Sequence, residues 1–130
     1  MSQFRKQHHG RSNTKSSGNG KKKLKFRDKQ RSESGDYFVA TKLAESNRST
    51  KIRRKGGAPG TRLKAVAFAN VLTKSGFKKT KITRVVESKN NRNFARQNII
   101  TKGSVIATEL GNAVVLNRPG REGTINARLV

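Results

Sequence analysis

The sequence contains no cysteine, only two histidines, and seven acidic residues against 31 lysines and arginines. Without cysteine there is no disulfide framework and no thiolate ligand for a metal ion, which fits a reducing compartment. Metal-dependent hydrolysis needs several carboxylates that converge on one site. The only acidic residues close together in the sequence are Glu33 and Asp36. The composition therefore argues against a metal-dependent nuclease.

The sequence also lacks the residue patterns that other kinds of catalysis need. The two histidines, His8 and His9, are adjacent in a basic N-terminal segment and have no further metal ligands near them in the sequence. Gly18–Lys21 contains glycines and a lysine, but it lacks the spacing of a phosphate-binding loop and no apolar strand precedes it. We expect a protein that is not an enzyme, with no metal, no cofactor and no small-molecule substrate.

Long hydrophobic runs are absent as well. Hydrophobic residues make up 31% of the chain, and no run reaches the roughly 20 apolar residues that cross a bilayer. The start, MSQFRKQHHG, has no apolar stretch after its charges, so we expect no secretory signal. These features predict a soluble cytoplasmic protein without a membrane partner.

The abundant feature is positive charge, with a formal net charge of +24 over 130 residues. A free protein with such a charge repels itself, and a polyanion normally compensates it. Nucleic acid is the first candidate. An anionic membrane surface is the second, but we find no long basic amphipathic helix to lie on one. The charge therefore predicts a nucleic-acid partner.

Residues 1–36 form a basic tail in which glycines and serines interrupt any helical pattern. Such a segment buries too little apolar surface to offset its ordering entropy, so we expect it to be disordered alone and to order on RNA. Each lysine or arginine that meets a phosphate releases a condensed counterion. A targeting or solubilising arm is the other interpretation. The predicted RNA-contact residues of the tail are Arg5, Arg11, Lys15, Lys21, Lys22, Lys23, Lys25 and Arg27.

Residues 37–130 show short strand patterns separated by glycine-containing turns. Together they predict an all-β, barrel-like antiparallel core of six or so strands. The Phe77–Glu87 strand should carry a basic face, and Arg62–Leu72 favours a strand over a helix. The expected strands are 37–43, 51–55, 62–72, 77–87, 104–110, 113–117 and 124–130. The expected turns are 56–60, Ser75–Gly76, Gly111–Asn112 and 118–123.

A polar loop, Asn90–Asn98, is the most distinctive stretch of the expected core. It places one aromatic, Phe94, between two arginines, and apolar residues follow it. Arginine and asparagine bind phosphates and base edges, and an aromatic ring stacks on unpaired bases. A solvated loop with Phe94 as its core anchor is the alternative. The predicted RNA-contact residues of the core are Arg53, Arg54, Arg92, Arg96 and Lys102, although each is also compatible with a solvated charge.

The segment Asn98–Gly111, NIITKGSVIATELG, closely resembles the C-terminal core signature of the archaeal and eukaryotic small-subunit ribosomal protein eight-e family. Shorter similar pieces are Gly10–Gly18, Lys51–Arg54, Gly56–Gly57, Ala69–Val71, Asn91–Arg92, Arg118–Gly120 and Thr124–Ala127. The chain departs from the family at Asn19, where a second glycine is usual, and the region 28–50 matches poorly. Its short length resembles the archaeal members.

The resemblance implies a structural component of the small ribosomal subunit, with a β-barrel-like core and an N-terminal extension that follows ribosomal RNA. The implied partners are small-subunit ribosomal RNA and neighbouring small-subunit proteins. Three alternatives stay open at this point. One is a ribosome-assembly factor, since eukaryotes have a related one. Another is an architectural chromatin protein, although the sequence has no helical DNA-recognition motif. The third is an RNA-modifying or RNA-cleaving enzyme whose activity depends on Glu87, Glu109 or Glu122, and we expect no such activity.

Overall fold

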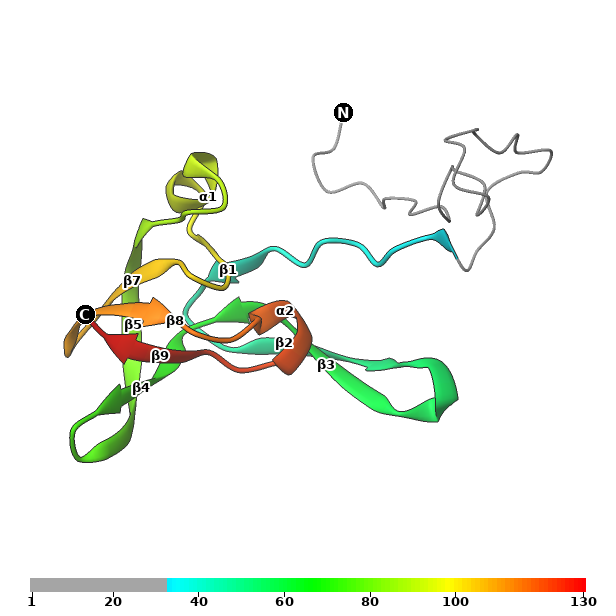
Figure 1. Cartoon of the computed structure of the whole chain (residues 1–130), viewed down its shortest axis with the longest axis horizontal. Coiled ribbons are helices and arrows are strands. Elements are labelled where there is room, and N and C mark those ends of the chain that lie inside the picture. Colours follow the sequence, from blue (N-terminus) through cyan, green and yellow to red (C-terminus); the bar gives the residue numbers. More distant parts are fainter. Residues whose placement is uncertain (1–32) are drawn as a thin grey trace, which may run out of the picture. The chain divides into compact units, whose positions relative to one another are not determined.

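The computed structural model describes residues 33–130. Contacts divide the chain into two units, Met1–Phe38 and Val39–Val130, and the elements named here all lie in the second. In chain order (Figure 1) they are β1 (Thr41–Leu43), β2 (Arg48–Arg53), the 3₁₀ turn η2 (Lys55–Gly57), β3 (Pro59–Val66), β4 (Phe68–Thr73), β5 (Gly76–Glu87), α1 (Arg92–Arg96), β6 (Ile99–Ile100), β7 (Val105–Thr108), β8 (Gly111–Val115), α2 (Pro119–Glu122) and β9 (Asn126–Leu129).

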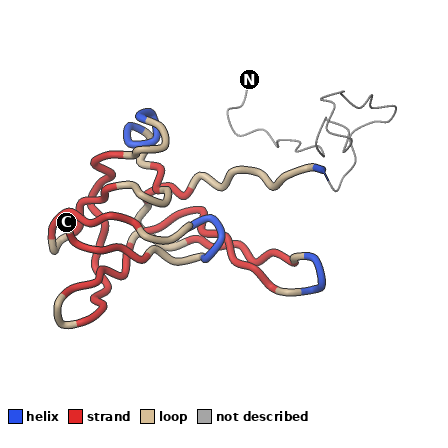
Figure 2. Tube along the Cα trace, in the orientation of Figure 1, coloured by secondary structure: helices blue, strands red, loops and turns tan. Residues whose placement is uncertain are grey.

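The strands form two sheets, and Figure 2 shows how little helix accompanies them. One sheet is a closed barrel in the order β4-β5-β7-β8-β9, and the other is a four-stranded sheet in the order β2-β3-β1-β6. The prediction of an all-β, barrel-like core is confirmed. The barrel itself has five strands, and the pairings of β4 with β9 and of β1 with β3 are parallel rather than antiparallel.

The core fills the barrel and the space under the second sheet. Alternation places the buried side chains: in β4 Ala69 and Val71 are buried while Phe68 and Leu72 are exposed, as expected for a strand with one solvated face. The core cluster consists of Leu63, Val66, Ala69, Val71, Ile82, Val85, Ile100, Ile106, Ala113, Val115, Ile125 and Ala127. All of these residues are aliphatic, which matches the low aromatic content of the sequence.

The segment 62–72 is strand, as predicted, but it is divided between β3 and β4 by a bend at Ala67. At this bend the Ala67 N–H donates to Asn47 Oδ1 at 2.8 Å, and the Ala67 carbonyl accepts the Ile82 N–H at 2.9 Å. The bend carries the chain from the second sheet into the barrel. The prediction of one continuous alternation of inward and outward side chains is therefore wrong at the bend, where Val66 and Ala67 are both buried.

Several other boundaries differ from the expectation. Only Thr41–Leu43 of the expected 37–43 strand pairs with β3 and β6. The strand predicted at 51–55 lies at Arg48–Arg53, and Pro59 already pairs with Arg53, so that the expected 56–60 loop is shortened at its end. The expected turn at 118–123 is the single helical turn α2, which Gly123 closes with φ +76°.

Two hairpin turns lie earlier in the chain than predicted. Thr108 pairs with Gly111, so the two turn residues are 109 and 110, and the prediction of a Gly111–Asn112 turn is wrong. Gly111 is instead the first residue of β8, with φ +123°, a conformation that glycine adopts without strain. Similarly, the pairing of Thr73 with Gly76 places the first turn at residues 74 and 75.

The predicted basic face of β5 is confirmed. Lys79, Lys81 and Thr83 are exposed, while Thr80 and Ile82 between them are buried. The pairing with β7 shifts register after Ile82, because a bulge inserts an unpaired residue into the strand. Arg84, which was expected on the inner side with Ile82, is therefore exposed.

Candidate nucleic-acid interface

The eight predicted contact residues of the tail lie outside the described residues, as do His8, His9 and the expected disorder of the tail. The residues in question are Arg5, Arg11, Lys15, Lys21, Lys22, Lys23, Lys25 and Arg27. The five predicted contact residues of the core are all described, and all five are exposed.

The expected loop Asn90–Asn98 contains the short helix α1, which the sequence pattern did not predict. Asn91 is its N-cap, and its side chain accepts the Asn93 N–H at 2.9 Å. The chain leaves the helix through Asn98, which has φ +51°, a left-handed conformation that asparagine tolerates better than most residues. A cap and a left-handed exit thus hold five residues in a helix without help from hydrophobic periodicity.

The side chains of the asparagines around α1 form hydrogen bonds that hold this loop in position. Asn90 Nδ2 donates to Thr101 Oγ1 at 3.0 Å. Asn98 Oδ1 accepts the Val85 N–H at 3.4 Å, and its carbonyl accepts the Leu43 N–H at 3.0 Å. These residues position the loop, which leaves the arginines as its groups for binding a phosphate.

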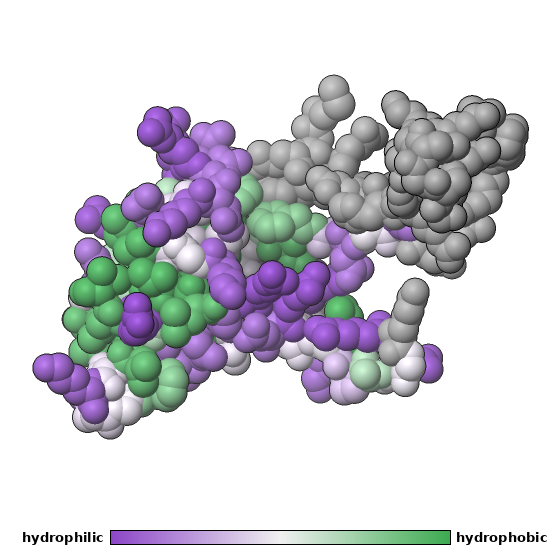
Figure 3. Space-filling view, viewed as in Figure 1, coloured by the Kyte–Doolittle hydropathy of each residue, from purple (hydrophilic) through white to green (hydrophobic). Residues whose placement is uncertain are grey.

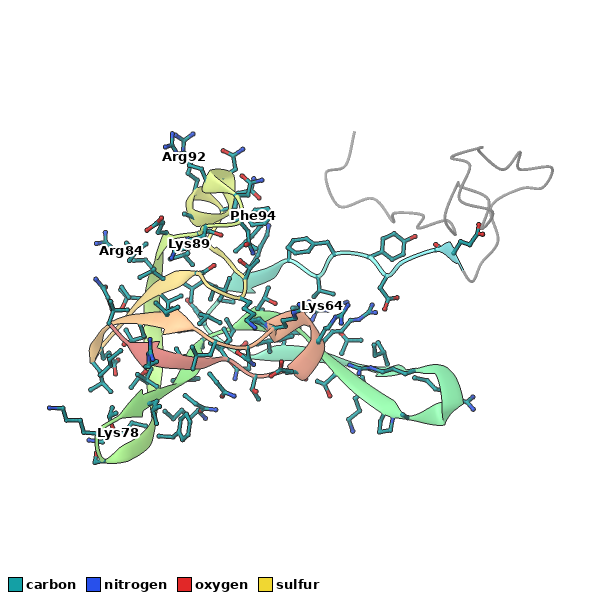
Figure 4. All side chains as sticks on the ribbon, viewed as in Figure 1. Lys64, Lys78, Arg84, Lys89, Arg92 and Phe94 are labelled. Carbon is teal, nitrogen blue, oxygen red and sulfur yellow. The ribbon has the colours of Figure 1, made fainter. Side chains whose placement is uncertain are left out.

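Arg92 and Arg96 lie four residues apart on α1 and are both exposed. Side chains at this spacing share one face of a helix. Figure 4 shows Arg92 pointing away from the strands, with Phe94 on another side of the helix. Phe94 is half-buried, and the α1 residue that packs against the core cluster is Ala95. The loop therefore presents a pair of guanidinium groups on a fixed base.

Lys102 is exposed in the tight turn between β6 and β7. The turn rests on a buried hydroxyl cluster, in which Ser104 Oγ lies 3.0 Å from Thr101 Oγ1 and 3.4 Å from Ser88 Oγ. Because Asn90 also donates to Thr101, the same cluster ties the turn of Lys102 to the start of the α1 loop. The structure thus connects the turn of Lys102 to the α1 loop through hydrogen bonds. The sequence alone groups these two segments only because both carry positive charge.

Arg53 is the last residue of β2 and Arg54 follows it, and the structure gives the two arginines different surroundings. Arg54 Nη2 donates to the Arg121 carbonyl at 3.1 Å. Its guanidinium also lies against Gly60, where an added Cβ would come within 2.4 Å of Arg54 Nε. Arg54 therefore fastens the β2–β3 hairpin to α2. Arg53 is exposed next to it.

The sequence prediction omitted many exposed cations of the core, among them Lys64, Lys78, Lys79, Lys81, Arg84 and Lys89. Figure 4 shows Lys78 and Arg84 pointing outward from β5. The alternation of 77–87 already indicated a basic face and was the signal that pointed to the β5 residues. Figure 3 shows hydrophilic residues gathered over α1, α2 and the β2–β3 hairpin, with a hydrophobic area over β7, β8 and β9.

Acidic residues are sparse on this surface. Residues 39–130 contain 20 lysines and arginines against four glutamates. One of these, Glu122, accepts the Asn117 Nδ2 at 3.0 Å and the Arg118 N–H at 3.3 Å, and so stabilises α2. Within residues 33–130 no three histidines or carboxylates gather to hold a metal ion, and no helix there is long and apolar enough to span a membrane. The arrangement suits the binding of a polyanion.

Comparison with known proteins gives consistent matches. Residues 8–130 match the family described as Ribosomal protein S8e. The chain is 45% identical over 113 residues to small ribosomal subunit protein eS8 of Sulfurisphaera tokodaii, which covers 85% of this chain and 88% of the relative. It is 42% identical over 125 residues to the eS8 protein of Hyperthermus butylicus, covering 95% and 91% of the two chains. The eS8 protein of Ignicoccus hospitalis is 43% identical over 113 residues, covering 85% and 87%.

Proposed function

Since the chain belongs to the ribosomal protein S8e family, we propose that it is a structural, non-catalytic component of the small ribosomal subunit in the cytoplasm and that it binds small-subunit ribosomal RNA. The family confirms the resemblance of Asn98–Gly111 to the small-subunit proteins. The relatives are small ribosomal subunit proteins, which supports the ribosomal role. One observation supports the RNA binding: residues 39–130 expose many cations and contain only four acidic residues.

In this mechanism some residues contact the RNA, and others hold those contact residues in position. Arg92, Arg96 and Lys102 contact phosphates from a base that the asparagines and the buried hydroxyl cluster hold still. A fixed base lowers the conformational entropy that binding costs. Arg53 contacts RNA from the β2–β3 hairpin, and Arg54, which is also exposed, positions that hairpin. The eight tail cations add further phosphate contacts.

Neighbouring small-subunit proteins are the second proposed class of partner. Exposed apolar side chains suit such contacts better than phosphate contacts, and Leu110 and Leu116 are 44% and 45% exposed. Chemical crosslinking of purified small subunits would test this assignment. Crosslinks from substituted cysteines at these two positions to ribosomal proteins are expected, and crosslinks to RNA alone would contradict it.

Removal of residues 1–36 tests the proposed RNA contacts of the tail. The chain loses 11 lysines and arginines, so binding to purified small-subunit RNA should weaken by orders of magnitude and its salt slope should become shallower. The measurement is the dissociation constant between about 50 and 200 mM salt, a range over which affinity from phosphate contacts falls steeply. Circular dichroism of the shortened chain serves as the control for the β core. An unchanged salt slope would show that the tail does not meet phosphates.

A further inference from the structure

The outer face of the β4–β5 ladder carries aromatic rings and lysines side by side. In the register, Phe68 lies opposite Lys81, Asn70 opposite Lys79, and Leu72 opposite Phe77. Side chains directly opposite each other share one face of a sheet. The rings of Phe68 and Phe77 are 39% and 66% exposed. This face was absent from the sequence-based list of contact residues.

Phe68 and Lys79 form a cation–π pair on this face, with Lys79 Nζ 4.9 Å from the ring centroid. Such a pair attracts within about 6 Å. It holds a positive charge beside an apolar plane. A ligand that contacts both groups therefore combines a flat apolar surface with a nearby negative charge.

A pocket of about 200 Å³ lies beside this pair, and Phe68 and Lys79 are among its lining residues. It also reaches buried aliphatic side chains of β3 and of the segment before β9, namely Leu63, Val66 and Ile125. Its volume exceeds the roughly 30 Å³ of one water molecule and falls below the roughly 300 to 1,000 Å³ of sites for drug-sized ligands. One planar heterocycle matches this size better than a complete nucleotide cofactor.

Two amide side chains line the same pocket, Asn47 and Asn70. Asn47 accepts the Ala67 N–H through Oδ1 at 2.8 Å. Asn70 donates to Asn126 Oδ1 through Nδ2 at 3.2 Å. The Nδ2 of Asn47 and the Oδ1 of Asn70 then offer one donor and one acceptor to a ligand. A nucleobase carries both complementary kinds of group on its edge.

The charge around the pocket favours an anion-bearing ligand. From residue 68 to residue 86 the sequence has five lysines and arginines and no acidic residue. An apolar side chain of a protein neighbour would gain nothing from this charge, whereas the phosphates on either side of a base would. We propose that the pocket receives one unpaired base of the ribosomal RNA, in contact with Phe68, while Lys79 binds an adjacent phosphate. This inference rests on the proposed RNA-binding function and adds a specific site to it.

Two synthetic RNA hairpins test the site on the full chain. One carries a single bulged adenosine, and the other is the same hairpin without the bulge. The wild-type chain is expected to bind the bulged hairpin more tightly at equal salt. Phe68→Leu keeps the side chain apolar but removes the ring, and it should reduce this preference at least about fivefold, since stacking of a base on an aromatic ring has that effect or more. Phe77→Leu is the matched control, because Phe77 lies on the same face but does not line the pocket.

A second pair of variants separates the site from general charge effects. Lys79→Gln should lower the salt slope for the bulged hairpin by about one and reduce the preference for the bulge. Lys78→Gln removes the same charge from the neighbouring residue, which points to the other face of the strand, and should leave the preference unchanged. These surface variants decide the question if Phe68→Leu proves unstable in a thermal melt.

The outcomes distinguish this inference from the function it rests on. The base site would be overturned if the wild-type chain bound both hairpins tightly without preference, or if Phe68→Leu kept the preference. An apolar contact with a neighbouring protein would then be the better interpretation of the pocket. A wild-type chain that binds neither hairpin at low salt would instead contradict the proposed RNA binding.

Discussion

The barrel and the β2–β3 hairpin are both made of strands, yet they are stabilised differently. In the barrel, Val71, Ile106 and Ala127 are completely buried. In the hairpin, no described side chain between residues 51 and 62 is buried, and Figure 1 shows its turn lying well away from the barrel. An isolated hairpin is marginal in water at best. The barrel is therefore stabilised by its own core, whereas the hairpin needs outside contacts.

Those contacts come from α2 and from Gly123, the residue that follows it. Arg54 donates to the Arg121 carbonyl, and its guanidinium lies against Gly60. At Gly123 an added Cβ would meet Thr61 Cγ2 at 2.6 Å. The hairpin is thus held at its base, and its cations stay in solvent. The comparison shows how one small chain combines a stable core with a basic surface that suits a polyanion.

The largest effect is expected from a cavity in the barrel. Ile106→Ala should lower the free energy of unfolding by about 2 to 5 kcal/mol, because Ile106 is fully buried in the core cluster. Chemical denaturation followed by circular dichroism measures this loss. Ile52→Ala is the matched control, because Ile52 lies in the hairpin and is only half-buried. It should lower the free energy of unfolding far less. Equal losses at the two positions would break the contrast between the barrel and the hairpin.

A smaller loss is expected where backbone conformation matters in the barrel. Gly111→Val should destabilise the protein by about 1 to 3 kcal/mol, because a residue with a side chain is strained at φ +123°. The nearest side-chain atom to an added Cβ is Leu129 Cδ2 at 4.0 Å, so crowding adds little to this strain. Thermal unfolding compared with Asn112→Ala, an exposed neighbour outside the turn, provides the measurement. Full stability of Gly111→Val would exclude the observed β7–β8 turn.

The attachment of the hairpin is tested by a pair of charge-matched variants. Arg54→Gln should weaken the base of the hairpin by about 1 kcal/mol through loss of the hydrogen bond to Arg121. Hydrogen exchange of the β2 and β3 amides should then accelerate. Arg53→Gln removes the same charge without that bond and should leave the exchange rates unchanged. Identical exchange in both variants would mean that Arg54 does not fasten the hairpin.

The smallest effect on stability is expected in the α1 loop, where positioning residues and contact residues are separated. Arg92→Gln should leave the unfolding free energy unchanged and reduce the salt slope of RNA binding by about one. Asn91→Ala should cost about 1 kcal/mol by removing the helix cap. Denaturation and binding measured on both variants check the two halves of this prediction. A stability loss in Arg92→Gln would show that this arginine is structural instead.

The sequence predicted the parts of the fold that depend on local alternation. The basic face of β5 and the buried Ile125 and Ala127 before and within β9 followed from a period of two. The bend at Ala67 was missed because the Ala67 N–H donates to the side chain of Asn47, which is 20 residues away. The β7–β8 turn was misplaced because Gly111 is the first residue after the turn and not one of the two turn residues.

The candidate site was predicted in composition but not in arrangement. The exposure of Arg92, Arg96 and Lys102 followed from their polar surroundings. Helix α1 was missed because five residues are too few to show helical periodicity, and its cap is a single asparagine. The positioning role of Arg54 depends on Arg121, 67 residues later in the chain, and no local pattern carries such a contact.

The most direct test of the ribosomal function is gradient sedimentation of a native lysate, with the fractions probed for this chain at low and moderate salt. We predict that the chain sediments with mature small subunits and stays with them through a moderate salt wash. Its presence only in lighter precursor particles would indicate an assembly factor. Recovery as free or chromatin-bound protein would contradict the ribosomal function.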